Sequence, residues 1–257
     1  MGIPIGLPRA GGGLGILGVV IFLAIQLLGG GSGSSVALGP QTVPGAPQAE
    51  DGLRDFSVYV FHDTQDFWAG QIQGYEHAKL VLYRGGVDTG CGSASSAVGP
   101  FYCPDDERVY LDLSFYRDMA ERLGAPGDFA WAYVIAHEMG HHVQQQLGTD
   151  DKVRKLQSQD RGQVNPLSVR LELQADCYAG VWAQHVYQAG DLEKGDVEEA
   201  ITASEAVGDD RLQREQTGEV RPDTFTHGTS AQRHAWFEKG RTAGEPAVCD
   251  TFSPDKV

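Results

Sequence analysis

The chain has 257 residues, a formal net charge of −15 at pH 7 and four cysteines. No cluster of basic residues occurs along it, which argues against binding to nucleic acid or to an anionic lipid surface. We interpret the acidity as a source of solubility. After about fifty residues of apolar and Gly/Ser/Pro-rich sequence, about two hundred remain, which is enough for one domain with a sizeable core.

The first part of the chain, residues 1–30, is predicted to be a membrane segment. Residues 14–28 are uncharged and rich in Leu, Ile and Val, and flanking glycines extend the run to about 20 residues, enough to cross the hydrocarbon layer. A cleaved signal peptide is the alternative, with Ser35-Val36-Ala37 as its cleavage site. We favour an uncleaved transmembrane helix because the run is long for the core of a signal peptide.

The charges around this segment predict its orientation. Arg9 precedes the run and acidic residues follow it, so the positive-inside rule places the N-terminus in the cytoplasm. Residues 31–50 are rich in Gly, Ser and Pro and are predicted to form a flexible linker. We therefore expect a single-pass protein of the cell membrane, with residues 51–257 as an extracytoplasmic domain, or a secreted domain if the segment is cleaved.

The pattern that points to chemistry is His137-Glu138-Met139-Gly140-His141. An apolar run begins at Asp128, a capping residue type, and predicts that the pattern lies on a buried helix. The spacing places both imidazoles on one face of that helix, where they can bind zinc, with Glu138 beside them as a general base. His142 points about 100° away from that face, so we expect it behind the site or at the surface.

A catalytic zinc needs a third protein ligand, and the extended pattern HExxHxxGxxH does not supply it, because Gln144 and Leu147 occupy the last two defining positions. Glu172 is the predicted third ligand, on a helix that opens with Asn165-Pro166. Asp176, one turn further, is predicted to accept a hydrogen bond from a zinc-binding histidine. Other candidates for the third ligand are His227, His234 and Glu205, of which Glu205 lies in an acidic segment that we interpret as a solvated helix end.

Six segments that together span nearly the whole chain carry a resemblance to a known family: residues 11–31, 91–104, 109–116, 137–144, 172–182 and 227–237. Through them the sequence resembles the bacterial neutral zinc metallopeptidases that carry a Gly-rich N-terminal membrane segment. The resemblance implies a gluzincin-like arrangement of HExxH plus a later glutamate. His227 matches a late segment of the family and is the candidate donor to the developing oxyanion, with Arg233 second. Alternatively, His227 caps a C-terminal helix.

The even number of cysteines is typical of an oxidising compartment. Cys91 and Cys103 bracket a Gly/Ser loop. A disulfide between them would stiffen this loop and add on the order of 3 kcal/mol to the free energy of unfolding. Cys177 would then pair with Cys249 and join the Glu172 helix to the C-terminal tail. This is one of three possible connectivities, and Cys177 could instead be a metal ligand or a buried thiol.

The remaining patterns predict an α+β fold, a mostly helical zincin-like domain with a small sheet after the N-terminal transmembrane helix. Alternating apolar residues indicate that residues 108–113 form a strand with one face buried. A strand just before the HExxH helix is where zincins place the sheet edge that pairs with a peptide substrate. The elements expected are helices at 54–70, 114–123, 128–147, 166–188 and 194–207, and strands at 79–83 and 108–113.

The predicted function is hydrolysis of peptide bonds by zinc-activated water. Zn²⁺ lowers the pKa of water toward neutrality, and Glu138 takes the proton and later gives it to the leaving amine. One alternative is a zinc-bound scaffolding or binding module with little turnover, and another is a zinc amidase of cell-wall peptides. Glu138 favours an enzyme, because a purely structural site needs no general base beside the metal.

Overall fold

The computed structural model of the chain describes residues 47–253. The predicted membrane segment, residues 1–30, lies outside the described residues, as does most of the predicted linker. None of the helices within the described range combines the length and apolar character needed to cross a membrane. Helix α2 begins at Pro47, so the last residues of the range predicted as linker belong to a helix.

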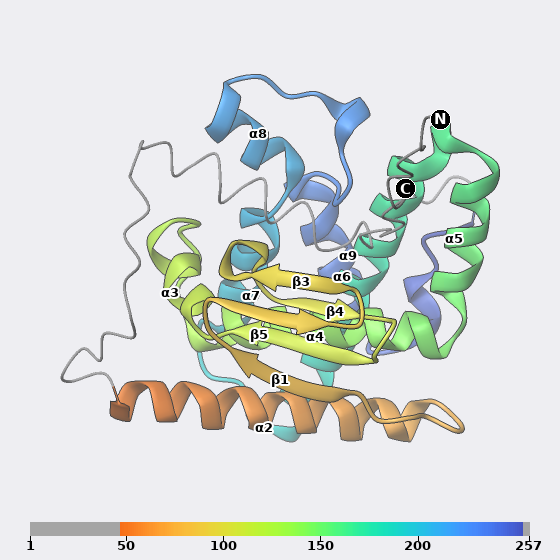
Figure 1. Cartoon of the computed structure of the whole chain (residues 1–257). Coiled ribbons are helices and arrows are strands. Elements are labelled where there is room, and N and C mark those ends of the chain that lie inside the picture. The colour runs from red at the N-terminus through yellow and green to blue at the C-terminus, as the bar shows by residue number, and fades with distance from the viewer. Residues whose placement is uncertain (1–46, 254–257) are drawn as a thin grey trace, which may run out of the picture.

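The described chain is mostly helical with a small sheet, as an α+β fold requires (Figure 1). Each helix and strand predicted within residues 47–253 is present. The sequence analysis did not predict α5, α8 or the strands β2 to β4, and it named α9 only as the C-terminal helix of the alternative role of His227. The elements in chain order are α2 (Pro47–Gln71), β1 (Lys79–Tyr83), β2 (Gly86–Thr89), β3 (Gly92–Ser95), η2 (Ser96–Val98), β4 (Phe101–Cys103), β5 (Arg108–Asp112), α3 (Ser114–Glu121), α4 (Asp128–Gln146), α5 (Thr149–Gln159), η3 (Arg161–Gln163), α6 (Val164–Ala189), α7 (Asp196–Ala206), α8 (Asp209–Thr217), η4 (Pro222–Thr224), α9 (Ser230–Ala243) and η5 (Pro246–Cys249).

The larger sheet has the order β1-β5-β4, in which β1 is parallel and β4 antiparallel to β5. Strand β5 is therefore central and both of its edges are occupied. The prediction that residues 108–113 supply the free sheet edge next to the HExxH helix is wrong, and the short strand β4 takes that place. Its alternation was hard to detect, because it has only three residues and all of them are buried.

Helix α4 crosses behind the strands, with α2 on one side and α6 on the other (Figure 1). Small residues allow the close packing of α6 against its neighbours. A Cβ atom on Gly140 of α4 would lie 3.0 Å from the Cα atom of Ala175 on α6. A Cβ atom on Gly180 of α6 would lie 2.0 Å from the carbonyl oxygen of Phe237 on α9. The helix that carries Glu172 is thus held closely from two sides.

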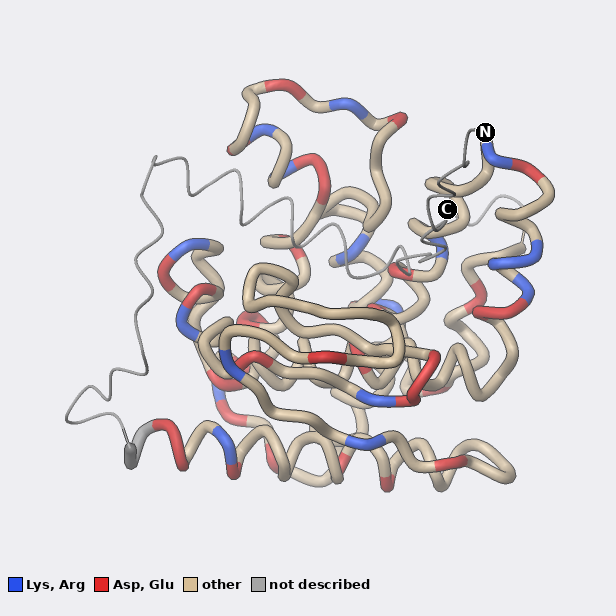
Figure 2. Tube along the Cα trace, viewed as in Figure 1, with Lys and Arg blue, Asp and Glu red and all other residues tan. Residues whose placement is uncertain are grey.

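Two disulfides are present, Cys91–Cys103 and Cys177–Cys249, with Cα atoms 5.9 Å and 5.5 Å apart. The second joins α6 to η5, and all four cysteines are paired, so Cys177 is neither a metal ligand nor a free thiol. Lys and Arg are scattered among Asp and Glu along the described chain (Figure 2). Ion pairs between exposed side chains contribute little to stability. The stability of the fold therefore comes from the hydrophobic core and the two disulfides.

Candidate metal centre

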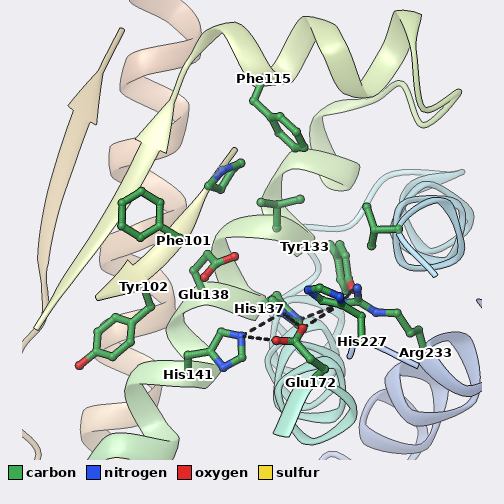
Figure 3. Close-up of a pocket in the computed structure, with 13 residues that line it drawn as sticks. Phe101, Tyr102, Phe115, Tyr133, His137, Glu138, His141, Glu172, His227 and Arg233 are labelled. Carbon is green, nitrogen blue, oxygen red and sulfur yellow. Dashed lines mark hydrogen bonds and ion pairs between the residues drawn. The ribbon is translucent and has the colours of Figure 1, made fainter. Parts of the chain in front are cut away.

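Three side chains from two helices converge at one point. His137 and His141 project from α4, and Glu172 faces them from α6 (Figure 3). The Nε2 atom of His137 lies 3.2 Å from the Nε2 atom of His141 and 3.2 Å from Oε2 of Glu172. The Nε2 atom of His141 lies 3.5 Å from Oε1 of Glu172. Two imidazole nitrogens and one carboxylate are the donor set of a catalytic zinc site with an open fourth position.

The electrostatics of this point favour a cation. The three residues are only 7%, 6% and 2% exposed, so bulk water cannot stabilise their charges. Burial alone would raise the pKa of Glu172, but the imidazoles around it, His227 foremost, outweigh burial and hold that pKa well below its usual range. Burial likewise opposes charge on His137, yet Asp176 and Glu172 raise the pKa of its imidazole to about 10. A positive charge is thus stabilised where the three donor atoms meet.

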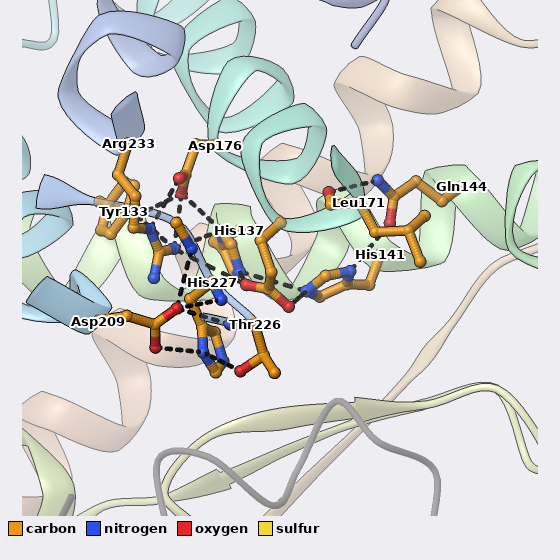
Figure 4. A network of polar contacts seen from close by, with 12 residues as sticks. Tyr133, His137, His141, Gln144, Leu171, Asp176, Asp209, Thr226, His227 and Arg233 are labelled. Carbon is orange, nitrogen blue, oxygen red and sulfur yellow. Dashed lines mark hydrogen bonds and ion pairs between the residues drawn. The ribbon is translucent and has the colours of Figure 1, made fainter. Parts of the chain in front are cut away.

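Asp176 fixes the orientation of His137 (Figure 4). Its carboxylate lies 2.8 Å from Nδ1 of His137 and accepts a 2.5 Å hydrogen bond from the hydroxyl of Tyr133. Arg233 donates to both of its oxygens at 2.8 Å. Burial opposes ionisation, but Arg233 and His137 lower the pKa of Asp176 to about 2. An ionised Asp176 accepts the proton on Nδ1 and leaves Nε2 free for a metal.

Gln144 fixes the orientation of His141, as Asp176 fixes that of His137. Its side-chain nitrogen donates to the carbonyl of Leu171 at 2.7 Å, which turns its oxygen toward Nδ1 of His141 at 2.9 Å. Nδ1 therefore carries the proton, and Nε2 faces Glu172. In the sequence Gln144 only marked the absence of the extended zinc pattern. Its role depends on a contact with the next long helix, which spacing along one helix could not indicate.

Glu138 lies on the pocket side of α4, next to the edge strand β4. Its carboxylate lines the same pocket as the three donor residues, and the backbone of Tyr102 favours its ionised form. Burial raises the pKa of Glu138, and the imidazoles of His141 and His137 partly offset that rise. A carboxylate whose pKa is raised toward neutrality is better suited to accept and return a proton.

His227 lines the pocket from the loop before α9, beside Arg233 (Figure 3). It is not a helix cap, because Thr229 occupies the N-cap of α9 with a full capping box. Asp209, at the start of α8, holds this loop: its Oδ2 accepts the backbone N–H groups of Thr226, His227 and Gly228 at 2.7, 2.6 and 3.0 Å. Its Oδ1 lies 3.4 Å from Nδ1 of His227.

Asp209 corrects one interpretation of the sequence. We expected the segment around Glu205 to be a solvated helix end, and the Glu205 side chain is indeed 41% exposed and paired with His234. Asp209, in the same acidic segment, is only 4% exposed. Its position directly after Gly208 at a helix start was the available signal, because acidic residues are favoured in the first turn of a helix. The buried partner could not be inferred without the tertiary fold.

The other candidates for the third ligand do not join the cluster. Among residues 47–253, the group of metal-binding residue types that contains the two histidines of α4 is completed by Glu172 alone. Arg233 lies 3.9 Å from Glu172, but its Nε and Nη2 atoms are engaged by Asp176. His142 is fully buried behind the site, where its Nε2 lies 2.7 Å from the carbonyl oxygen of Glu76 and its Nδ1 lies 2.9 Å from the Tyr102 hydroxyl.

A mostly helical domain with such a cluster beside a buried glutamate is typical of zinc metallopeptidases, and the comparisons agree. A family model described as "Putative neutral zinc metallopeptidase" matches residues 5–252. The chain belongs to this family, which implies Zn²⁺ as its cofactor.

Relatives of the chain occur in distant bacteria. The uncharacterized protein YpfJ of Escherichia coli K12 is 50% identical over 254 residues, which cover 96% of this chain and 88% of that protein. Uncharacterized proteins of Mycobacterium bovis and Mycobacterium tuberculosis H37Rv are each 44% identical over 197 residues, which cover 72% of this chain and 66% of each relative. No solved structure matches the chain.

Proposed function

We propose that the protein is a zinc-dependent peptidase that hydrolyses peptide bonds outside the cytoplasmic membrane. The observation that carries the proposal is the convergence of His137, His141 and Glu172 in a pocket that also contains the carboxylate of Glu138. These three residues would hold Zn²⁺, which when bound acts as a Lewis acid on water and on the scissile carbonyl. A purely structural zinc site needs four protein ligands and no neighbouring base, so the arrangement favours an enzyme.

The chain's own groups would then carry the proton transfers. Glu138 takes a proton from the attacking water and returns it to the leaving amine. His227 donates a hydrogen bond from Nε2 to the developing oxyanion. In the neutral ring this requires the tautomer in which Nδ1 accepts from the hydroxyl of Thr226, 3.1 Å away, so that the proton lies on Nε2. Arg233, the second candidate for this role, acts instead behind His137, since its hydrogen bonds go to Asp176 and Tyr133.

The substrate backbone would pair with β4. This strand is at the edge of the sheet, and its residues Phe101 and Tyr102 line the pocket. Because β4 pairs with β5 on one side only, the backbone groups on its other side pair with no strand of the described sheet. A peptide added along this edge would be held through its main chain, which tolerates varied sequences.

The proposed location is the cell membrane, with the domain on the outer side. The two disulfides support it, because such bonds persist in oxidising compartments. Non-reducing mass mapping of protein isolated from its native membrane should find the pairs Cys91–Cys103 and Cys177–Cys249. Four free thiols would contradict the location, and a mature N-terminus near Ala37 would favour the secreted form.

The decisive experiment compares the zinc-loaded full chain with its Glu138→Gln variant on a broad peptide library. The wild type should cleave in a zinc-dependent way, while Glu138→Gln should bind zinc equally and lose most turnover. Bound zinc without cleavage would favour the scaffolding alternative. Cleavage restricted to cell-wall peptides would favour the amidase alternative, which uses the same chemistry on another amide.

A further inference from the structure

Another cavity, of about 440 Å³, lies between α5, α6 and η5 and shares no lining residue with the pocket of the metal centre. Sites for small ligands are typically cavities of roughly 300–1,000 Å³ with mostly apolar walls and a few polar groups. The apolar part of this wall consists of Val153, Leu156, Pro246, Ala247 and Phe252. Leu156 is 47% exposed, so part of the wall is left uncovered by the fold.

The hydroxyl of Tyr178 on α6 is a hydrogen-bond donor without a partner in this wall. The residue is only 4% exposed, yet its hydroxyl forms no hydrogen bond with any residue in the range 47–253. The oxygen is not fully enclosed either, so it opens onto the cavity. Burial raises the pKa of Tyr178 to about 12, so the hydroxyl stays protonated and can donate. Buried phenols usually have a partner, and a ligand with an acceptor atom would supply it.

The other polar groups of the wall favour an anionic end on such a ligand. Lys152 on α5 is exposed and takes part in no ion pair within the described chain. Helix α5, 11 residues long, begins at Thr149 in the wall, and no side chain caps its first N–H groups. The acidic residue of the lining, Asp250, is already engaged, since its Oδ1 accepts the backbone N–H groups of Phe252 and Ser253 at 3.0 and 3.1 Å.

Hydrogen bonds connect this wall to the metal centre. Nε2 of Gln174 donates to the carbonyl of Cys249 at 2.9 Å, which turns its oxygen toward Nε2 of Gln144 at 3.1 Å. Gln144 in turn places its own oxygen 2.9 Å from Nδ1 of His141 (Figure 4). Gln174 and Cys249 both line the cavity, so an occupant would contact the residues that begin this series of hydrogen bonds.

We propose that the cavity binds an apolar group that ends in a carboxylate, and that its occupant stabilises zinc binding. The carboxylate accepts hydrogen bonds from Tyr178 and Lys152, while the apolar group covers Leu156. An occupant that holds η5 against α6 keeps Gln174, and through it Gln144, in the arrangement that orients His141. Two sources supply this chemistry, the C-terminus of a peptide that ends in an apolar residue and a fatty acid. The inference does not depend on the proposed peptidase function.

Calorimetric titrations of the zinc-loaded full chain test the site. The probes are N-acetyl-leucine, octanoate, and N-acetyl-leucinamide, in which a neutral amide replaces the carboxylate. We expect saturable binding of a carboxylate at one site per chain, and binding of the amide at least about tenfold more weakly, because hydrogen bonds to charged groups are the stronger ones. Tighter binding of N-acetyl-leucine identifies a peptide C-terminus as the source, and tighter binding of octanoate identifies a fatty acid.

Variants of the two donors assign the binding to this cavity. Tyr178→Phe removes an oxygen that has no partner in the fold, so it should leave the melting temperature unchanged and weaken binding about tenfold. Lys152→Met keeps the apolar stem and should weaken binding similarly. The matched controls are Tyr187→Phe, on α6 but 61% exposed, and Lys155→Met, on α5 but outside the cavity. Both controls should bind as the wild type does.

Equilibrium zinc titrations with and without the carboxylate test the link to the metal centre. The carboxylate should tighten zinc binding at least about fivefold, and zinc should tighten carboxylate binding by the same factor. At the same carboxylate concentration, Tyr178→Phe should show little of this effect. A carboxylate that acted by contacting the zinc itself would affect Tyr178→Phe as much as the wild type.

Four results would overturn the inference while leaving the proposed peptidase function intact. The first is the absence of saturable binding, and the second is equal binding by the wild type and both donor variants, which would place the carboxylate at the zinc. The third is binding that occurs only after residues 254–257 are removed, which would assign the cavity to the chain's own C-terminal residues. The fourth is a zinc affinity that the bound carboxylate leaves unchanged. A chain that binds the carboxylate as expected but hydrolyses no peptide would overturn only the proposed function.

Discussion

Asp209 accepts the backbone N–H of His227 at 2.6 Å, and its second oxygen lies 3.4 Å from the Nδ1 atom of the same residue. A single buried carboxylate thus fixes both the main chain and the ring of His227. Because α8 begins at Asp209, the position of His227 in the pocket depends on how α8 packs next to α9.

Changes at these two residues should affect the rate and not the metal. His227→Ala should lower kcat by about 10²–10³-fold, the loss usual for one oxyanion donor, and Asp209→Asn should lower it less. Zinc affinity should remain as in the wild type for both. Asp223→Asn, an exposed change near the same loop, is the control and should leave kcat unchanged. Loss of zinc from His227→Ala in an equilibrium titration would assign His227 to the metal instead.

Zinc titrations of the full chain should distinguish the proposed metal ligand Glu172 from the proposed general base Glu138. Glu172→Gln should weaken zinc binding strongly, because a neutral amide is a poor ligand, and Asp176→Asn should weaken it about 10–100-fold. Glu138→Gln should leave zinc affinity unchanged while abolishing most hydrolysis. Glu205→Gln, at a partly exposed glutamate that lies four residues before an aspartate as Glu172 does, is the matched control.

The assignment fails if Glu172→Gln binds zinc as the wild type does while a change at Glu205, His227 or His234 abolishes binding. Removal of the metal with a chelator provides an independent check. It should stop hydrolysis, and added Zn²⁺ should restore it.

The parts of the site that the sequence predicted are those fixed by the geometry of one helix. Residues four apart on a helix share a face, so His137 with His141, and Glu172 with Asp176, could be placed together before the fold was known. Small residues let helices approach closely, and Ala175 and Gly180 lie where α4 and α9 pack closely against α6.

The features that the sequence did not predict depend on contacts between elements distant in sequence. Arg233 reaches Asp176 from a helix 57 residues away, and Gln144 is oriented by a carbonyl 27 residues away. The sheet edge was assigned to the wrong strand, because β5 has the clearer alternation but becomes central once β1 and β4 pair with it. Pattern along the chain specifies which face of an element is buried, not which neighbour covers its edge.

The hydrogen bond between Tyr102 of β4 and His142 of α4 should influence substrate binding. Because Nε2 of His142 must donate to the carbonyl of Glu76, its Nδ1 is an acceptor and the Tyr102 hydroxyl is the donor. Tyr102→Phe leaves that buried nitrogen without a partner, which costs about 1–3 kcal/mol, and loosens the proposed substrate edge. We expect a higher KM, a nearly unchanged kcat and unchanged zinc affinity.

Tyr110→Phe is the matched control for this prediction. Tyr110 lies on β5, is equally buried, and donates to Asp106 away from the pocket. Its loss should lower the melting temperature without raising KM. If both variants raise KM equally, the Tyr102 hydroxyl has no special part in holding the edge.

Glycine at position 180 should be essential for the contact between α6 and α9. A Cβ atom there would lie 2.0 Å from the carbonyl oxygen of Phe237, a backbone atom that cannot move without shifting α9. Overpacking of this kind costs about 1–3 kcal/mol or more, so Gly180→Ala should lower the free energy of unfolding by at least that amount.

Gly70→Ala on α2 is the control, because nothing lies within 4 Å of its added Cβ. Alanine there should stabilise the helix by up to about 1 kcal/mol. Denaturant unfolding of both variants provides the measurement, and equal stabilities for them would contradict the close approach of α6 and α9. Because α9 also carries Arg233, Gly180→Ala should weaken zinc binding as well, whereas Gly70→Ala should not.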